Sequence, residues 1–203
     1  MFYLGLDLGK KRDFTALVIV ERTSDYYGSG LLVRYAERMA LGTLYTKVVE
    51  RVAAMSRGHR ELNGFCHLTV DATGVGVAVE EALRAEKGGW RGITAVTITG
   101  GDRARQASGF GVGEHWNVPR RDLLGGVQLL LEKAELKISA RMRESRTLVR
   151  ELIRMRRVPA AAGAGGSETV GEPEEHDDLV MGLGLGCWQA SRPRNGMGTQ
   201  RIL

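Results

Sequence analysis

The chain has 203 residues, of which 43% are hydrophobic and 26% are charged, a balance that is typical of a globular protein with a single domain. No apolar run is long enough for a membrane span, the start of the chain lacks the features of a signal peptide, and no P-loop string occurs. Two cysteines without zinc-ligand spacing favour a reducing, intracellular setting. The net charge of +5 is compatible with a nucleic-acid partner, although many other enzymes share such a charge.

The beginning of the chain is typical of three short strands. Apolar, β-prone residues occupy the ranges 2–8, 14–22 and 31–38, and turn-forming residues separate them. Short links between consecutive strands indicate an antiparallel meander.

Strands and helices then alternate. The pattern predicts a helix over 43–58, a strand over 66–71, a helix over 76–87 and a strand over 93–98. Thr43 is the expected N-cap of the first helix. Because such alternation indicates parallel crossovers, we expect an α/β fold with a mixed sheet, in which three antiparallel strands are followed by parallel strands and helices flank the sheet.

The second half of the chain is mostly helical. Its expected elements are a long, glycine-rich mobile loop over 99–118, a helix from Pro119 to about Lys133, a short segment over 136–139, a helix over 141–157, a flexible loop over 158–175 and a helix over 176–190. We expect one domain over residues 1–190, followed by a basic, flexible tail over 191–203.

Aspartates stand where the chain leaves buried structure. Asp7 and Asp71 each close a predicted strand, and Asp177 and Asp178 open the last helix. Taken singly, each is explained as a turn former or a helix cap. If they converge on one edge of the sheet, their charges repel one another unless a cation neutralises them. Oxygen ligands select Mg²⁺ or Mn²⁺, and two such ions about 3.5–4 Å apart support phosphodiester hydrolysis.

Four segments of the sequence resemble the nuclease domain of the large terminase subunit of tailed bacteriophages, which has a ribonuclease-H-like fold. The segments are GLDLGKKRDFTALVIVE, LTVDATGVG, VPRRDLLGGVQLLLEKAELKI and EHDDLVMGLGLGCW. The resemblance covers nearly the whole chain, residues 3–190, and its most specific part runs from His176 to Met181.

This resemblance implies a metal-dependent endonuclease that cuts concatemeric viral DNA during genome packaging by a two-metal mechanism. It implies that Asp7, Asp71 and Asp178 are catalytic metal ligands, and that Asp177 is a second ligand or an outer partner. Asp13 matches a family position and His176 could orient a carboxylate or touch phosphate, although a turn and a helix cap explain these two residues as well.

The resemblance also implies the cofactors and partners. The cofactors are two divalent cations, Mg²⁺ or Mn²⁺, and the partners are double-stranded DNA, a packaging ATPase domain, a portal and a small terminase subunit, without a membrane. The expected location is the cytoplasm of an infected bacterial cell. Full terminases carry an ATPase domain ahead of the nuclease, which this sequence lacks, so we expect an excised domain, a separately encoded nuclease or a relative with another task.

Arginines recur at steps of three and four residues along the 141–157 helix, which places them on one stripe. The stripe consists of Arg143, Arg146, Arg150, Arg154 and Arg157, and the apolar residues Leu148, Val149, Leu152, Ile153 and Met155 fall broadly opposite. A solvated face and a surface that contacts DNA phosphates both explain such a stripe. Four further arginines could hold a second stretch of DNA backbone: Arg103, Arg105, Arg120 and Arg121.

The last helix contains Gly182, Gly184 and Gly186, although each glycine costs about 1 kcal/mol of helix propensity. We expect a close approach of this helix to the sheet as the reason, with Cys187 as a small core residue.

Three alternative functions stay open. A Holliday-junction resolvase of the same superfamily would need a dimer. The opening Gly5–Gly9 string also occurs in actin-like ATPases and sugar kinases, but their two lobes need about twice this length. A non-catalytic DNA-binding scaffold would leave the clustered carboxylates without a use, and such clusters cost stability.

Overall fold

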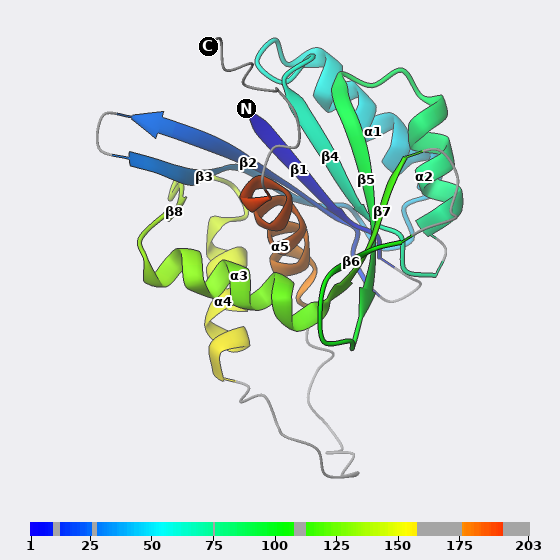
Figure 1. Cartoon of the computed structure of the whole chain (residues 1–203). Coiled ribbons are helices and arrows are strands. Elements are labelled where there is room, and N and C mark those ends of the chain that lie inside the picture. Colours follow the sequence, from blue (N-terminus) through cyan, green and yellow to red (C-terminus); the bar gives the residue numbers. More distant parts are fainter. Residues whose placement is uncertain (10–12, 26–27, 75, 108–112, 158–175, 193–203) are drawn as a thin grey trace, which may run out of the picture.

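The computed structural model describes residues 1–9, 13–25, 28–74, 76–107, 113–157 and 176–192 (Figure 1). An eight-stranded sheet forms the centre of this part of the chain, and helices cover both of its faces. Within the described ranges, no helix has both the length and the apolar character that crossing a bilayer requires.

The sheet is mixed, as the sequence predicts. Its strands are β1 (Phe2–Asp7), β2 (Ala16–Asp25), β3 (Gly28–Arg38), β4 (Cys66–Asp71), β5 (Trp90–Thr99), β6 (Arg105–Gln106), β7 (Glu114–Pro119) and β8 (Leu136–Ile138). Their spatial order is β6-β7-β5-β4-β1-β2-β3-β8. Strands β1 to β3 form the expected antiparallel meander, and β4, β5 and β7 continue the sheet in parallel from β1. This arrangement confirms the predicted fold class.

Alternation along the strands divides the core between two helical layers. Leu4, Leu6 and Leu68 lie in a cluster with the buried side of α1 (Tyr45–Gly58) and α2 (Gly76–Ala85). The opposite face is covered by α3 (Arg120–Glu132), α4 (Ser145–Arg157) and α5 (Asp178–Ser191). Val18 and Val20 pack on that side with the apolar residues of α4 and α5.

One strand contradicts a predicted loop, and another forms in a short segment for which the sequence predicts no element type. The glycine-rich segment 99–118 contains β7, which pairs in parallel with β5 from Thr94 opposite Glu114 to Thr99 opposite Pro119. The short segment after α3 forms β8, which pairs with Leu31–Val33 at the edge of the sheet. Both strands are short and have few apolar residues, so their pairing with a neighbouring strand, rather than their own pattern, establishes them.

Two helix starts also differ from the prediction. α1 has Leu44 as its N-cap, and the Thr43 hydroxyl instead donates a hydrogen bond to the Ala40 carbonyl at 2.6 Å. α4 begins at Ser145 rather than at residue 141. The predicted loop over 158–175 and positions 193–203 of the predicted tail lie outside the described residues.

The glycines of α5 meet the sheet and α3 closely, which confirms the expected close approach. A methyl group added to Gly182 or Gly186 would lie 3.2 Å from a methyl carbon of Val18 or Val20, respectively. A methyl group on Gly184 would lie 3.2 Å from the Cβ of Leu123 on α3. Cys187 is 1% exposed in the same helix, as predicted. The absence of side chains at these positions therefore lets α5 lie directly on the strands that carry the site.

Candidate metal and nuclease site

The register of β1 and β4 brings Asp7 next to Asp71. These strands pair in parallel from Phe2 opposite Cys66 to Leu6 opposite Val70, and each strand then ends at its aspartate. Residues at matching positions of neighbouring strands point to the same face. The two carboxylates therefore leave the sheet side by side, at the edge where the sequence predicts a site.

The N-terminus of α5 completes this site. A pocket of about 310 Å³ lies between the ends of β1 and β4 and the start of α5. It is lined by Asp7, Leu8, Gly9, Asp13, Asp71, Thr73, Ile98, Arg120, His176, Asp177, Asp178 and Met181. The structure thus brings together all four predicted metal ligands and both predicted auxiliary residues.

Asp7 lies at the electrostatic centre of the pocket. Its removal from water raises the pKa of its carboxyl well above the ordinary value, and the negative charges of Asp71, Asp178, Asp177 and Asp13 raise it further. All five carboxylates line the same pocket. The pocket therefore concentrates negative charge around a partly buried group.

Asp178 is the buried member of the aspartate pair on α5. It is 5% exposed, and its Oδ2 atom has no hydrogen-bond partner. Oδ2 lies 3.7 Å from a guanidinium nitrogen of Arg38 and 3.9 Å from Nδ1 of His176. Burial raises the pKa of Asp178, although the charges of Arg38 and His176 act in the opposite direction. An unsatisfied buried carboxylate oxygen in a polar pocket is costly in free energy and indicates a missing partner.

The other two aspartates already have partners. The Asp177 side chain is paired with Arg120, which comes from the start of α3. One Asp71 oxygen accepts a 2.8 Å hydrogen bond from the Thr73 amide, so the turn-forming role considered for this residue is also present.

Sequence reasoning missed two charged residues beside the pocket, Arg38 and Glu151. Glu151 is 5% exposed, and its carboxylate accepts hydrogen bonds from the Arg38 guanidinium and from the Val180 amide. Burial raises the pKa of Glu151 to about 7, against the effects of Arg38 and of the Val180 amide. The signal for Arg38 was its position, because it closes a predicted strand as Asp7 and Asp71 do.

The donor chemistry of the pocket fits a hard divalent cation. The candidate ligands offer carboxylate oxygens only, which are the donors that Mg²⁺ and Mn²⁺ prefer. The unsatisfied Oδ2 of Asp178 and the repulsion that acts on Asp7 would both be relieved by a cation. As they are placed, however, no three His, Cys, Asp or Glu side chains of the described residues gather closely enough to hold one ion.

The arginine face of α4 is partly as predicted. Arg146, Arg150 and Arg154 are exposed, whereas Arg143 precedes the helix and the side chain of Arg157 is outside the described part of the chain. Val149 and Ile153 are 40% and 49% exposed, so these two do not lie opposite the arginines as the sequence reading placed them. The reason is geometric: they follow Arg146 by three and seven residues, which returns them to its face of the helix. Leu148 and Leu152 lie on the buried side of α4.

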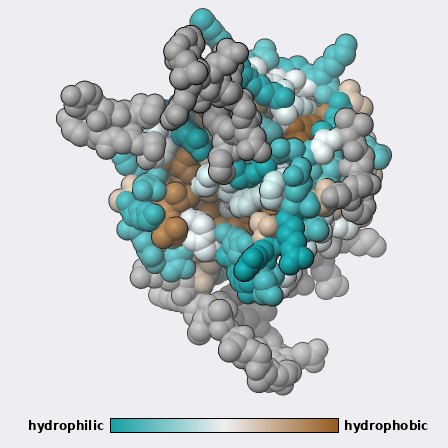
Figure 2. All heavy atoms as spheres, in the orientation of Figure 1, coloured by the Kyte–Doolittle hydropathy of each residue, from teal (hydrophilic) through white to brown (hydrophobic). Residues whose placement is uncertain are grey.

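The four arginines around the glycine-rich segment do not act as one group. Arg120 lines the pocket, whereas Arg121 pairs with Asp102 at 3.1 Å. Arg103 and Arg105 are exposed, the first just before β6 and the second at its start. Figure 2 shows the face of the molecule that points toward the viewer in Figure 1. Hydrophilic residues cover much of that face, while apolar residues gather on its left side, where α3 lies in Figure 1.

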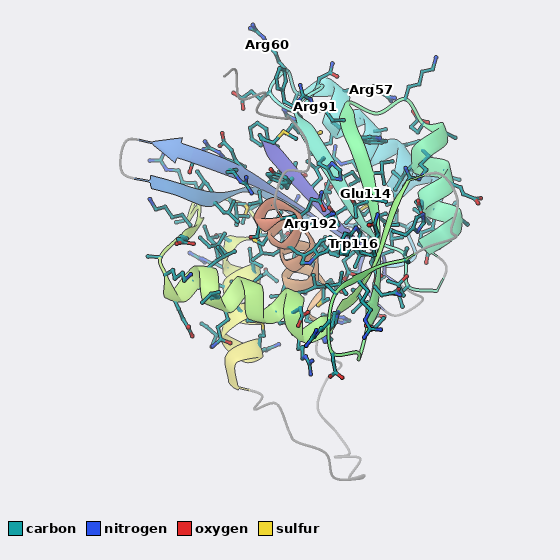
Figure 3. All side chains as sticks on the ribbon, in the orientation of Figure 1. Arg57, Arg60, Arg91, Glu114, Trp116 and Arg192 are labelled. Carbon is teal, nitrogen blue, oxygen red and sulfur yellow. The ribbon has the colours of Figure 1, made fainter. Side chains whose placement is uncertain are left out.

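A second set of contacts holds the far end of α5. The Arg192 guanidinium lies 4.3 Å from the ring centre of Trp116 and 5.0 Å from that of Trp188. It also pairs with Glu114 at 2.9 Å (Figure 3). Because β7 carries Trp116 and Glu114, these contacts join the C-terminal end of α5 to the sheet.

The sequence matches no protein-family model, and a search of curated proteins gives no match. Solved structures do match. The large terminase nuclease from thermophilic phage G20c is 21% identical, with a TM-score of 0.57, and the match covers 93% of this chain and 82% of that one. The human cytomegalovirus terminase nuclease domain is 12% identical, and its Mn-soaked, inhibitor-bound form gives a TM-score of 0.53 with the same coverage. Another structure of the cytomegalovirus domain is 12% identical, with a TM-score of 0.52, and covers 92% of this chain and 83% of that one.

These likenesses establish the fold. The described strands and helices of the chain share the fold of viral terminase nuclease domains, which the sequence resemblance predicts.

Proposed function

We propose that the protein is a divalent-metal-dependent DNA endonuclease that cuts concatemeric viral DNA during genome packaging. The observation that carries this proposal is the convergence of Asp7, Asp71 and Asp178 from β1, β4 and α5 on one pocket. The fold of two viral terminase nucleases, one of them soaked with Mn, supports the same activity.

In this proposal, Asp7, Asp71 and Asp178 hold two cations, Mg²⁺ or Mn²⁺. When bound, such a pair of ions activates a water molecule and stabilises the leaving oxygen in phosphodiester hydrolysis. Asp178 is the preferred ligand of the α5 pair because its Oδ2 is unsatisfied, whereas Asp177 is held by Arg120. His176 lies close enough to orient the Asp178 carboxylate.

Other residues of the pocket would bring the DNA to these carboxylates. Arg120 lines the pocket beside the aspartates and can contact a phosphate, with Asp13 close to the same space. The exposed arginines of α4 would contact the backbone of double-stranded DNA without reading its sequence. A packaging ATPase domain, a portal and a small terminase subunit are the proposed partners in the infected bacterial cytoplasm.

The test is nicking of supercoiled plasmid by the purified protein in Mg²⁺, in Mn²⁺ and in a chelator. We expect nicking with either metal and none in the chelator. Asp71→Asn should lose nicking by at least a factor of 10², because loss of one ligand charge mispositions the reacting groups, at a cost of about 3 kcal/mol or more. Asp102→Asn is the matched control, since Asp102 is an exposed aspartate outside the pocket.

A properly folded Asp71→Asn protein that nicks as fast as wild type would overturn the proposal. Metal-independent binding without nicking would indicate the non-catalytic scaffold instead. A second substrate, a four-way DNA junction, separates the two nuclease functions, because strong preference for the junction over linear duplex would indicate a resolvase.

A further inference from the structure

Beside the pocket, three charged side chains are buried next to one another. Arg38 ends β3, Glu151 belongs to α4 and Asp178 begins α5, and their side chains are 18%, 4% and 6% exposed. The proposed function uses only Asp178. Burying charges is costly unless they are paired well, so the presence of Arg38 and Glu151 at this position calls for a reason.

The sheet itself places Arg38 in the row of the candidate ligands. Asp7 pairs with Ala16 of β2, and Ala16 pairs with Arg38 of β3. Residues paired in this way point to the same face of the sheet. Because Ala16 between them is small, the long Arg38 side chain can extend over β2 toward the start of α5.

Glu151 fixes both Arg38 and the start of α5. One of its carboxylate oxygens accepts a hydrogen bond from the Arg38 guanidinium, and the other accepts a 3.1 Å bond from the Val180 amide. The N-cap residue Asp177 makes no capping bond with its side chain. Glu151 therefore satisfies one of the free amides at the start of α5 from a different helix.

Arg38 in turn connects Glu151 to Asp178. The guanidinium nitrogen that binds Glu151 also lies 3.7 Å from Oδ2 of Asp178, and the guanidinium packs 5.1 Å from the ring centre of Phe14. Phe14 itself contacts the His176 ring, with 5.0 Å between the ring centres. The Arg38 side chain is thus held from two sides while it faces the Asp178 carboxylate.

We propose that Arg38 is a positioning residue that holds the Asp178 carboxylate toward the pocket, and that Glu151 keeps Arg38 in place. This inference rests on the proposed function. A lone arginine here would repel an incoming cation, but the adjacent Glu151 carboxylate, when ionised, offsets the charge of Arg38. The negative charge of Asp178 is then left for the metal, while its orientation is fixed by a neighbouring group, as outer partners fix metal ligands elsewhere.

The same contacts connect the candidate DNA-binding helix to the metal site. Glu151 directly follows the exposed Arg150 on α4, and it bonds to the backbone two residues after Asp178. Glu151 is therefore one contact by which α4 meets the segment that carries Asp178.

The test uses the double variant Arg38→Met/Glu151→Gln, which preserves net charge and keeps an oxygen that can accept the Val180 bond. Two quantities are measured: the Mn²⁺ concentration at half of the maximal increase in melting temperature, and the kcat and KM for plasmid nicking. We expect the Mn²⁺ midpoint to rise about 10- to 100-fold, as for other outer partners of metal ligands, and kcat to fall with KM for DNA unchanged. The control is Arg51→Met/Glu37→Gln, which removes an Arg–Glu pair at 3.1 Å outside the pocket.

A folded Arg38→Met/Glu151→Gln protein with the wild-type Mn²⁺ midpoint and kcat would overturn this inference alone. A wild-type protein that neither nicks DNA nor is stabilised by Mn²⁺ would overturn the proposed function together with it. Arg38→Lys covers the case in which the double variant does not fold. Lysine keeps the charge but lacks the planar guanidinium that packs against Phe14, so its midpoint should rise by a smaller factor, and an unchanged midpoint would count against the inference.

Discussion

Gly5 on β1 and Gly182 on α5 touch backbone to backbone. A methyl group added to Gly5 would lie 1.9 Å from the Gly182 carbonyl oxygen and 2.8 Å from the Gly186 amide nitrogen. Two residues after Gly5, the same strand ends at Asp7, and four residues before Gly182 the helix begins at Asp178. Neither glycine has a side chain, so β1 and α5 can approach closely at this contact. The contact therefore controls the distance between the candidate ligands Asp7 and Asp178.

Gly5→Ala should destabilise the protein strongly, because the atoms in its way are backbone and cannot rotate aside. We expect a loss of about 3 kcal/mol or more in the free energy of unfolding, measured by urea denaturation. Gly125→Ala is the control, since a methyl group there meets nothing within 4 Å on α3. That change should stabilise the protein by about 0.5–1 kcal/mol through helix propensity. Equal stability of Gly5→Ala and wild type would show that α5 does not pack on β1 as described.

The sequence predicts those parts of the fold whose pattern is local. Buried runs that end in Asp7 and Asp71 are visible as strands, and the small residues of α5 indicate its close packing. β7 was not predicted, because it gains its structure from pairing with β5 rather than from its own pattern. The sequence marks the segment of β8 but not its type, which depends on pairing with β3, far away in the sequence. The candidate site likewise combines residues that a local pattern reveals with residues whose role depends on contacts between separate elements. The aspartates stand at element ends, whereas the role of Glu151 depends on how α4 packs against α5, which no spacing along the chain reveals.

Mn²⁺ should stabilise the wild-type protein in a thermal melt. A cation that binds only the folded state adds about 2.7 kcal/mol at a concentration of 100 times its Kd, which corresponds to about 5–10 °C in Tm for a chain of this size. The double variant Asp7→Asn/Asp178→Asn should show no such increase. In a chelator the same variant should melt above wild type, because two mutually repelling charges have been removed.

Asp102→Asn serves as the control in these melts, and it should respond to Mn²⁺ as wild type does. An equal increase in Tm for wild type and Asp7→Asn/Asp178→Asn would place the metal elsewhere and remove the basis of the proposed mechanism.

Arg146→Ala/Arg150→Ala should weaken binding to all DNA sequences alike. If both exposed arginines contact phosphates, the slope of log affinity against log salt concentration should fall by about 2. The control is Arg57→Ala/Arg60→Ala, because Figure 3 shows these arginines at the opposite end of the molecule from α4. Fluorescence anisotropy at several salt concentrations gives both slopes. An identical slope for the α4 variant and wild type would make the stripe an ordinary solvated face.

The contact between Arg192 and Glu114 should make a small, pH-dependent contribution to stability. Burial raises the pKa of Glu114, but the hydrogen bond and charge of Arg192 outweigh this effect, with help from the Thr94 hydroxyl, and the net pKa is lowered. A carboxyl whose pKa is lower in the folded state stabilises the fold above its unfolded pKa of about 4.3, and this contribution disappears as the pH falls through the folded value.

Because Glu114 is 44% exposed, Glu114→Gln should lower Tm at pH 7 by only about 1–3 °C. The difference from wild type should shrink progressively as the pH falls below about 4. Melting curves of both proteins between pH 3 and pH 7 measure this, and a difference that persists undiminished at pH 3 would mean that Glu114 holds the end of α5 by packing rather than by charge.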